Sequence, residues 1–315
     1  MPVYVGTIST PTPPVEPPTP IPTPAPPPID PGRPVAVWIA PDGTEWPLTN
    51  DSTLFFTLNA VTGWGAAPIN IVADDHPRGG TRVRHIQPQP RTITWPLRVR
   101  ADTHLELVAG WRALANAFTQ TRRLGPGRLR IMRPNGDARE ILAFYQQGFD
   151  GEPGQGHTYD TAVLSLYCED PFWRAIRPLS LPYAYGTAVS YLSPYLTVSP
   201  SSVLGTATAV IEGNVEAWPS WTIVGPATAL VATNHTTGES FTLTGSLSSG
   251  QVATITTDPP AVRGPGGANW TGKLNWPGAQ LWALQPGLND VEFAVTGAGA
   301  GTAITLSYFP RYETA

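Results

Sequence analysis

The sequence predicts a mainly β protein with a proline-rich N-terminal arm, a β domain that contains one α-helix, and a second, antiparallel β-sandwich. Three observations support this prediction. Short runs rich in β-branched and aromatic residues recur between Gly, Pro, Asn and Asp. Helical spacing appears in one stretch, and prolines dominate another. We therefore expect an arm at residues 1–34, a domain at 35–177, and a connection plus sandwich at 178–315.

The arm is defined by thirteen prolines within residues 10–34. Proline fixes φ and lacks a backbone donor, so this segment cannot form a helix or a central strand. It is expected to be a polyproline II rod, used as a spacer or laid along a neighbouring subunit. We favour docking, because a preformed rod loses little entropy when it binds.

The N-terminal domain begins with a predicted hairpin, "VAVWIAPDGTEWPLT", in which Asp42-Gly43 forms the turn. The runs "LFFTLN", "INIVAD", "TRVRHIQ" and "RTITWPLRV" follow as strands. The last two alternate Arg or Thr with apolar residues, which puts charge on one face. Later, a Pro-Asn-Gly-Asp turn joins two strands, and "AVLSLYCE" forms another that ends at Asp170-Pro171.

One helix is predicted between these strands. Thr103 and Glu106 have the spacing of a capping box. Gly125 can end the helix, and Arg122 and Arg123 suit the negative end of its dipole. The apolar stripe expected to pack on the sheet consists of Leu105, Val108, Trp111, Leu114, Ala115 and Phe118.

The second half returns to strands from residue 207, after a Pro-, Ser- and Tyr-rich connection at 178–206. Seven short runs follow, with turn residues every 8 to 12 positions, and no helical pattern is present. This spacing is typical of an antiparallel β-sandwich.

Composition limits the classes of function. Charged residues make up 13% of the chain, against the usual share of about 25%. Residues 78–139 contain thirteen Arg and three acidic residues, a net charge of +10, whereas seven acidic and three basic residues follow position 177. The overall charge of −4 gives no global nucleic-acid signal. The lone Cys168 excludes an internal disulfide, and no signal peptide or membrane span is expected.

Catalytic and metal-binding patterns are missing from the sequence. The five histidines lack metal-ligand spacing, and Cys168 fits a small buried hydrophobe. Asp74-Asp75-His76 resembles a ligand cluster but is more simply a loop. We therefore predict no enzyme activity, no cofactor and no metal.

Two binding hypotheses stay open. The arginines of residues 78–139 could contact phosphates, although no nucleic-acid module is present. Tryptophans of the second half could stack on sugars, although core packing or subunit contact is the commoner role for such residues. These tryptophans are Trp218, Trp221, Trp270, Trp276 and Trp282.

Several motifs, taken in order, resemble siphophage distal tail proteins. The first part carries "RTITWPLRVRADTHLELVAGWRALANAF", then "GRLRIMRPNGDAREI" and "AVLSLYCEDPFW". The second carries "GNVEAWPSWTIVGPA", "NHTTGESFTLTG" and a closing "LQPGLNDVEF". The resemblance covers about residues 35–315, and the proline-rich arm lies outside it.

The resemblance implies a structural virion protein at the distal end of a long non-contractile tail. Members form a ring, typically of six subunits, through an N-terminal domain related to the tail-tube fold. The second domain is galectin-like. The implied partners are further copies of the chain, the tail tube protein, the tape measure protein, the tail hub or tail-associated protein, and receptor-binding proteins. The alternatives are another minor tail or tube protein and a carbohydrate-binding tail adhesin.

A ring needs two different patches on each subunit. Arginine suits such a patch because it makes bidentate contacts and is weakly hydrated. The predicted subunit interface therefore consists of Arg82, Arg84, Arg98 and Arg100. The alternative is a solvated basic sheet face.

Overall fold

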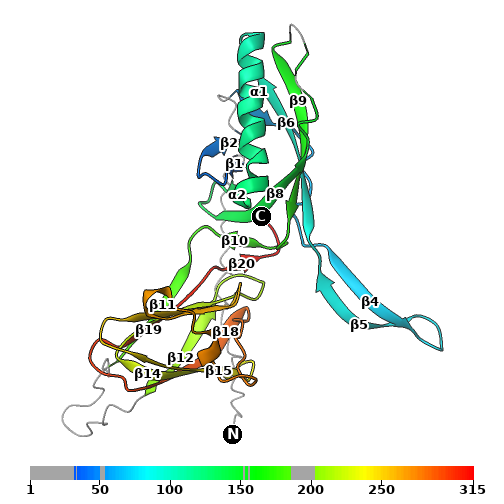
Figure 1. Ribbon diagram of the computed structural model, residues 1–315. Coiled ribbons are helices and arrows are strands. Elements are labelled where there is room, and N and C mark those ends of the chain that lie inside the picture. Colours follow the sequence, from blue (N-terminus) through cyan, green and yellow to red (C-terminus); the bar gives the residue numbers. More distant parts are fainter. Residues whose placement is uncertain (1–31, 33, 50–53, 152, 155–156, 186–202) are drawn as a thin grey trace, which may run out of the picture. The chain divides into compact units, whose positions relative to one another are not determined.

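A computed structural model describes residues 32, 34–49, 54–151, 153–154, 157–185 and 203–315 (Figure 1). The predicted arm at 1–34 lies almost wholly outside the described residues. The predicted mainly β architecture with its single long helix is confirmed. No described helix combines the length and apolar character needed to cross a membrane.

The largest sheet has nine strands and a nearly closed, barrel-like form. Its main order is β2-β1-β7-β8-β9-β6-β3, while β10 pairs with β8 and β20. Both hairpins predicted from Asp-Gly and Pro-Asn-Gly-Asp turns are confirmed, as β1–β2 and β7–β8. The strands are β1 (Val35–Ile39), β2 (Glu45–Pro47), β3 (Phe55–Thr57), β6 (Arg91–Arg100), β7 (Gly127–Met132), β8 (Ala138–Gln147), β9 (Tyr159–Cys168), β10 (Trp173–Ala175) and β20 (Arg311–Tyr312).

Helix α1 (His104–Thr119) packs on this sheet, and the short helix α2 (Thr121–Leu124) follows it. The predicted capping box is present, because Thr103 Oγ1 accepts from the Glu106 amide and the Glu106 carboxylate accepts from the Thr103 amide. Gly125 caps α2. The predicted stripe needs one correction: Leu105 is 80% exposed. The buried side is shifted round the helix and consists of Leu107, Trp111, Leu114, Ala117 and Phe118.

Aromatic side chains anchor the helix to the sheet. Trp38 stacks on Phe118 with 4.5 Å between ring centroids, and its Nε1 donates to the Ala117 carbonyl. Trp111 meets Phe149 edge to face. Because both tryptophans are buried with satisfied N–H groups, they fix the helix at two points along its length.

Strands β4 (Ile69–Asp75) and β5 (Thr81–Pro88) form a separate two-stranded sheet (Figure 1). Every residue of both strands is exposed. The interpretation of Asp74-Asp75-His76 as a loop was wrong for the two aspartates, which end β4. They continue the ladder because Asp74 pairs with Arg82 and Asp75 with Thr81.

The second half forms two sheets, of five and four strands, around a second core. The predicted strands are present, with orders β11-β19-β13-β16-β17 and β12-β18-β14-β15. Two 3-10 turns, Pro265–Gly267 and Thr271–Lys273, are the helical elements here, and the sequence did not indicate them. The strands are β11 (Leu179–Ala184), β12 (Val203–Ile211), β13 (Ser220–Val224), β14 (Ala227–Asn234), β15 (Glu239–Leu247), β16 (Val252–Thr256), β17 (Ala261–Arg263), β18 (Gly287–Thr296) and β19 (Ala303–Tyr308).

Three aromatic rings form the centre of the second core. Trp221 meets Phe241 and Trp282 edge to face, each at 5.0 Å between centroids. Trp221 and Trp282 are almost wholly buried. These two therefore have the core role that the sequence left open.

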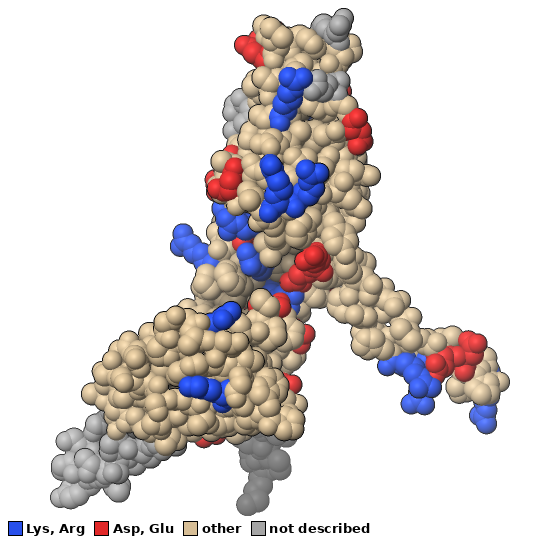
Figure 2. Space-filling model, viewed as in Figure 1, with Lys and Arg blue, Asp and Glu red and all other residues tan. Residues whose placement is uncertain are grey.

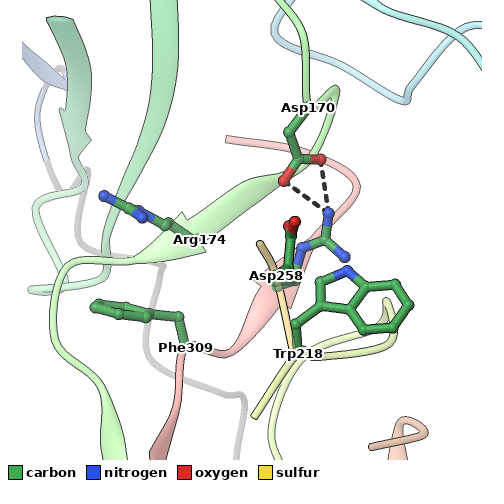
Figure 3. Close-up of a pocket in the computed structure, with 6 residues that line it drawn as sticks. Asp170, Arg174, Trp218, Asp258 and Phe309 are labelled. Atoms are coloured by element: carbon green, nitrogen blue, oxygen red, sulfur yellow. Dashed lines mark hydrogen bonds and ion pairs between the residues drawn. The ribbon is translucent and has the colours of Figure 1, made fainter. Parts of the chain in front are cut away.

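The C-terminal segment joins the two halves of the chain. After β19, strand β20 pairs with β10 of the nine-stranded sheet. The Arg311 carbonyl accepts hydrogen bonds from the Asn214 and Val215 amides. The Arg311 side chain binds both carboxylate oxygens of Asp170 (Figure 3). Gly213 lies directly beneath that carbonyl, so a β-carbon at this position would collide with it.

Replacing Gly213 with alanine is expected to destabilise the protein by about 2 kcal/mol or more, because it combines a φ of 110° with this collision. The matched control is Gly238→Ala, where φ is 77° but nothing lies within 4 Å of the added carbon. The control should cost only about 1 kcal/mol. Urea unfolding of both variants measures the difference, and equal losses would contradict the close contact at Arg311.

Candidate functional site

The four arginines of the predicted interface lie on two different sheets. Arg82 and Arg84 belong to β5, whereas Arg98 and Arg100 belong to β6. No ladder connects β5 to β6 among the described strands. The structure therefore gives two pairs of arginines in place of one continuous patch, and their role at an interface remains a prediction.

Arg98 and Arg100 lie on the face of β6 opposite the core. The strand alternates buried apolar residues with more exposed ones, as the sequence predicted. The guanidinium of Arg98 stands 4.9 Å from the Tyr159 ring centroid, and that of Arg100 stands 5.4 Å from the Phe56 ring centroid. Each cation therefore covers an aromatic face and is held in a defined place on the sheet.

Arg82 and Arg84 lie on the polar face of the β4–β5 hairpin. Arg82 is the ladder partner of Asp74, and Arg84 Nε donates to the Asp74 carboxylate. The bulge between Val72 and Ala73 gives Arg84 its place next to that pair. Figure 2 shows both charge signs together on this hairpin, so its charge is partly neutralised within the hairpin itself.

The opposite face of the hairpin is apolar, and the sequence analysis did not identify it as a candidate surface. Ile71 lies directly across from Ile86, and Ala73 lies across from Val83. Their large side chains are half exposed, at 53% for Ile71, 54% for Ile86 and 51% for Val83. Alternation in "INIVADD" and "TRVRHIQP" was the available signal, but it is also what a strand with one face in the core shows. The full apolar face consists of Ile69, Ile71, Ala73, Val83, Ile86 and Pro88.

Other arginines of the Arg-rich segment at residues 78–139 have partners within the chain. Arg91 is 2% exposed and donates to the Gly63, Gly65 and Glu313 carbonyls, and burial lowers its pKa. Arg133 and Arg139 donate to the backbone oxygens of Ala315 and Thr314. Three arginines thus hold three consecutive backbone oxygens, and much of the local positive charge stabilises the fold.

The buried Glu140 carboxylate forms ion pairs with two more arginines. Its carboxylate accepts from Arg130 at 3.2 Å and from Arg174 at 3.0 Å. Because Glu140 is 2% exposed, these cations compensate for a carboxylate that burial would otherwise make costly. Within residues 78–139, Arg91 and Arg130 therefore have partners inside the fold, whereas Arg122 and Arg123 are exposed.

The titratable residues form no recognisable reaction centre in the described part of the chain. No group of three or more His, Cys, Asp or Glu could hold a metal ion there. His235 pairs with Glu292 at 2.8 Å on the surface. Cys168 is wholly buried, as expected, and burial raises the pKa of its thiol to about 12.

Comparisons with known proteins agree with the motifs. Residues 212–312 match the family described as siphovirus-type tail component, C-terminal domain. No curated protein shows significant sequence similarity to the chain. The resemblance predicted from the sequence is confirmed by this family match together with the structural likenesses that follow.

Three solved structures share the fold. The crystal structure of SPP1 Dit, described as a paradigm of the hub adsorption apparatus in Gram-positive infecting phages, has a TM-score of 0.62 at 13% identity and matches 89% of this chain and 99% of its own. The phage P2 baseplate in its activated conformation with Ca has a TM-score of 0.55 at 10% identity, over 90% and 99% of the two chains. The corresponding structure with Sr gives 0.53 at 11% identity, over 88% and 98%.

The raised pKa predicts how Cys168 reacts. Thiolate is the reactive form, so the native protein should resist iodoacetamide at pH 8.5 and become labelled only after unfolding in urea. The same shift should make stability fall as pH rises above the ordinary thiol pKa toward 12, because the unfolded thiol then ionises first. Mass spectrometry follows the labelling, and fast native labelling would contradict the buried position.

Proposed function

We propose that this chain is a structural virion protein at the distal end of a long non-contractile phage tail. There it would form a ring that connects the tail tube to the baseplate hub and to host-recognition proteins. The family match over residues 212–312 and the fold shared with SPP1 Dit and the P2 baseplate protein support this proposal. The protein would act through binding and not through catalysis.

The exposed apolar face of the β4–β5 hairpin carries the assembly part of the proposal. A two-stranded hairpin is only marginally stable by itself, and exposed apolar patches on soluble proteins mark interaction sites. All fifteen residues of β4 and β5 are exposed in the single chain. A second copy of the chain that covers this face would bury the isoleucines and stabilise the hairpin.

Ring closure requires the hairpin of one subunit to meet a different surface of the next. The outer face of β6 and β9 is a suitable surface, because the helix covers the opposite side of this sheet. It presents Arg98 and Arg100 together with Tyr159, Val163 and Tyr167, which are 57%, 57% and 37% exposed. Apolar and aromatic area there suits the hairpin's isoleucines, and the arginines add charge-assisted contacts at its rim.

The complete assignment includes partners and place. The ring would be a hexamer built by the domain at residues 35–177, whose sheet β20 completes, while the rest of residues 178–315 forms the outer domain. Its neighbours would be the tail tube protein, the tape measure protein, the tail hub or tail-associated protein and receptor-binding proteins. The site of action would be the tail tip of the virion, after synthesis in the host cytoplasm, and the arm at 1–34 would dock on a neighbouring protein.

Charge on the apolar face should abolish assembly. The double variant Ile71→Asp with Ile86→Asp places two carboxylates in a facing pair, and we expect it to remain monomeric. The matched control, Asn70→Asp with Gln87→Asp, adds the same charge to a facing pair on the polar side and should assemble normally. Mass photometry and electron-microscopy class averages, with and without the tail tube protein, measure the rings.

A wild-type protein that stays monomeric in both conditions would contradict the ring proposal. Equal behaviour of the two double variants would instead reject the hairpin's apolar face as the contact and leave the ring intact.

Reversal of the four predicted interface arginines tests the charged contribution. Arg82, Arg84, Arg98 and Arg100 changed to Glu should weaken ring formation and make the remaining assembly less stable in low salt. The two pairs should be changed separately as well, because they lie on different sheets. Unchanged assembly in both sets would assign these residues to a solvated basic face.

A further inference from the structure

A row of three side chains crosses one end of the five-stranded sheet. Ser220 of β13 pairs with Thr256 of β16 on one side and with Ser307 of β19 on the other. Trp218, Asp258 and Phe309 each lie two residues beyond these pairs, outside the bounds of β13, β16 and β19.

These residues line a common hollow. One cavity of about 330 Å³ and an adjoining one of about 120 Å³ share Arg174, Trp218, Asp258 and Phe309 as lining residues. Figure 3 shows Trp218 and Asp258 next to the Asp170–Arg311 ion pair, with Arg174 and Phe309 side by side and pointing the other way. The larger volume lies within the range of small-molecule sites.

Trp218 is available to a ligand. Its side chain is 38% exposed, and within the described chain its indole N–H has no hydrogen-bond acceptor and its rings stack on no other ring. By contrast, Trp282 in the core donates to the Ala232 carbonyl. An exposed indole can donate its N–H to water, so this arrangement costs the fold little stability. It offers a ligand both an apolar surface and a hydrogen-bond donor.

Polar groups with unused hydrogen-bonding capacity lie beside the Trp218 ring. The Asp258 carboxylate is exposed and makes no hydrogen bond or ion pair with any described residue. Arg174 uses Nε and Nη2 for Glu140, which leaves Nη1 as an unused donor beside Phe309, whose ring lies 4.9 Å below the guanidinium. The hollow therefore offers one acceptor and two donors around an aromatic surface.

The position of Trp218 is fixed in advance. Ala217 exchanges two backbone hydrogen bonds with Leu284, and Ser220 begins strand β13, so Trp218 is held from both sides. The buried Thr257 hydroxyl donates to the Pro219 carbonyl, which fixes the turn between Trp218 and the strand and also the start of the Asp258 segment. Ligand binding would therefore lose little conformational entropy in these groups.

We propose that this hollow binds a neutral saccharide, with a pyranose ring stacked on Trp218. The C–H face of such a ring fits an indole, and its hydroxyl groups donate to the Asp258 carboxylate. The Trp218 N–H points along the indole plane, so the oxygens of the adjoining sugar unit accept from Trp218 Nε1 and from Arg174 Nη1. The two carboxylates and two guanidinium groups that line the smaller cavity balance in charge, which suits a neutral sugar. The site belongs to single chains, so it does not depend on ring assembly.

A proline-rich peptide, such as residues 10–34 of a neighbouring copy, is the competing occupant. Aromatic grooves bind such segments through the prolines and carbonyl groups. Proline has no backbone N–H, however, so a proline-rich segment would cover the Asp258 carboxylate with few donors to satisfy it. Hydroxyl-rich saccharides satisfy the acceptor and the donors together, and the observed groups therefore favour a sugar.

The test is binding of the full chain to an array of neutral oligosaccharides of glucose, galactose and N-acetylglucosamine, followed by saturation-transfer NMR titration of the best hit. We expect wild-type binding in the millimolar to micromolar range. Trp218→Ala should weaken it at least about tenfold, since stacking and one hydrogen bond are lost together. Asp258→Asn, which keeps shape but removes the charge, should also weaken binding.

Trp276→Ala is the matched control, because Trp276 is 56% exposed in the same half of the chain but lines neither cavity. It should bind as well as the wild type, and thermal melting should show that all variants fold. No binding to any neutral glycan, or binding unchanged by Trp218→Ala and Asp258→Asn, overturns the proposal. Trp218-dependent binding of a synthetic peptide of residues 10–34, without glycan binding, overturns it in favour of the proline-rich segment.

Discussion

Arg311 is the residue on which the connection between the two cores depends. Its guanidinium binds both oxygens of Asp170, donates to the Glu216 carbonyl and covers the Phe172 ring at 4.9 Å. Its backbone carbonyl receives two amides from the segment that enters the sandwich. One residue near the end of the chain therefore satisfies groups from both halves at once, because Nη2 binds both Asp170 oxygens while Nη1 binds the Glu216 carbonyl.

The motifs that suggested the family meet at this arginine. Asp170 and Phe172 come from "CEDPFW", whereas Gly213 and Glu216 come from "GNVEAWP". Separately, each motif looked like a strand end or a turn, with no evident chemistry. In the structure they form one joint, in which Gly213 is required because its neighbour is the Arg311 carbonyl. The segment that begins at Gly213 is thus a structural connection, which agrees with its lack of chemically activated residues.

The sequence predicted local structure better than it predicted surfaces. Turn residues, alternation and a capping box identified the hairpins, the helix and most strands, because these features depend on neighbours in the chain. Helical spacing alone placed Leu105 in the core, whereas the direction of the sheet decides that Leu107 is buried there instead. The net charge of residues 78–139 suggested one basic surface. Arg91, Arg133 and Arg139, however, bind backbone oxygens of residues 313–315. Contacts at such separations have no local signal.

This use of arginine changes where an assembly surface is expected. When cations are spent on buried carbonyls and on Glu140, part of the positive charge is compensated within the subunit, as it is for Arg84 with Asp74, while arginines such as Arg122 and Arg123 stay exposed. In the proposed ring, affinity comes mainly from apolar area, with charge setting register and partner choice. The unpartnered isoleucines of the β4–β5 hairpin supply such area, whereas the basic residues around them do not. In the proposed ring, a chain with only 13% charged residues would use part of its arginines to stabilise the subunit and its apolar hairpin to contact the next one.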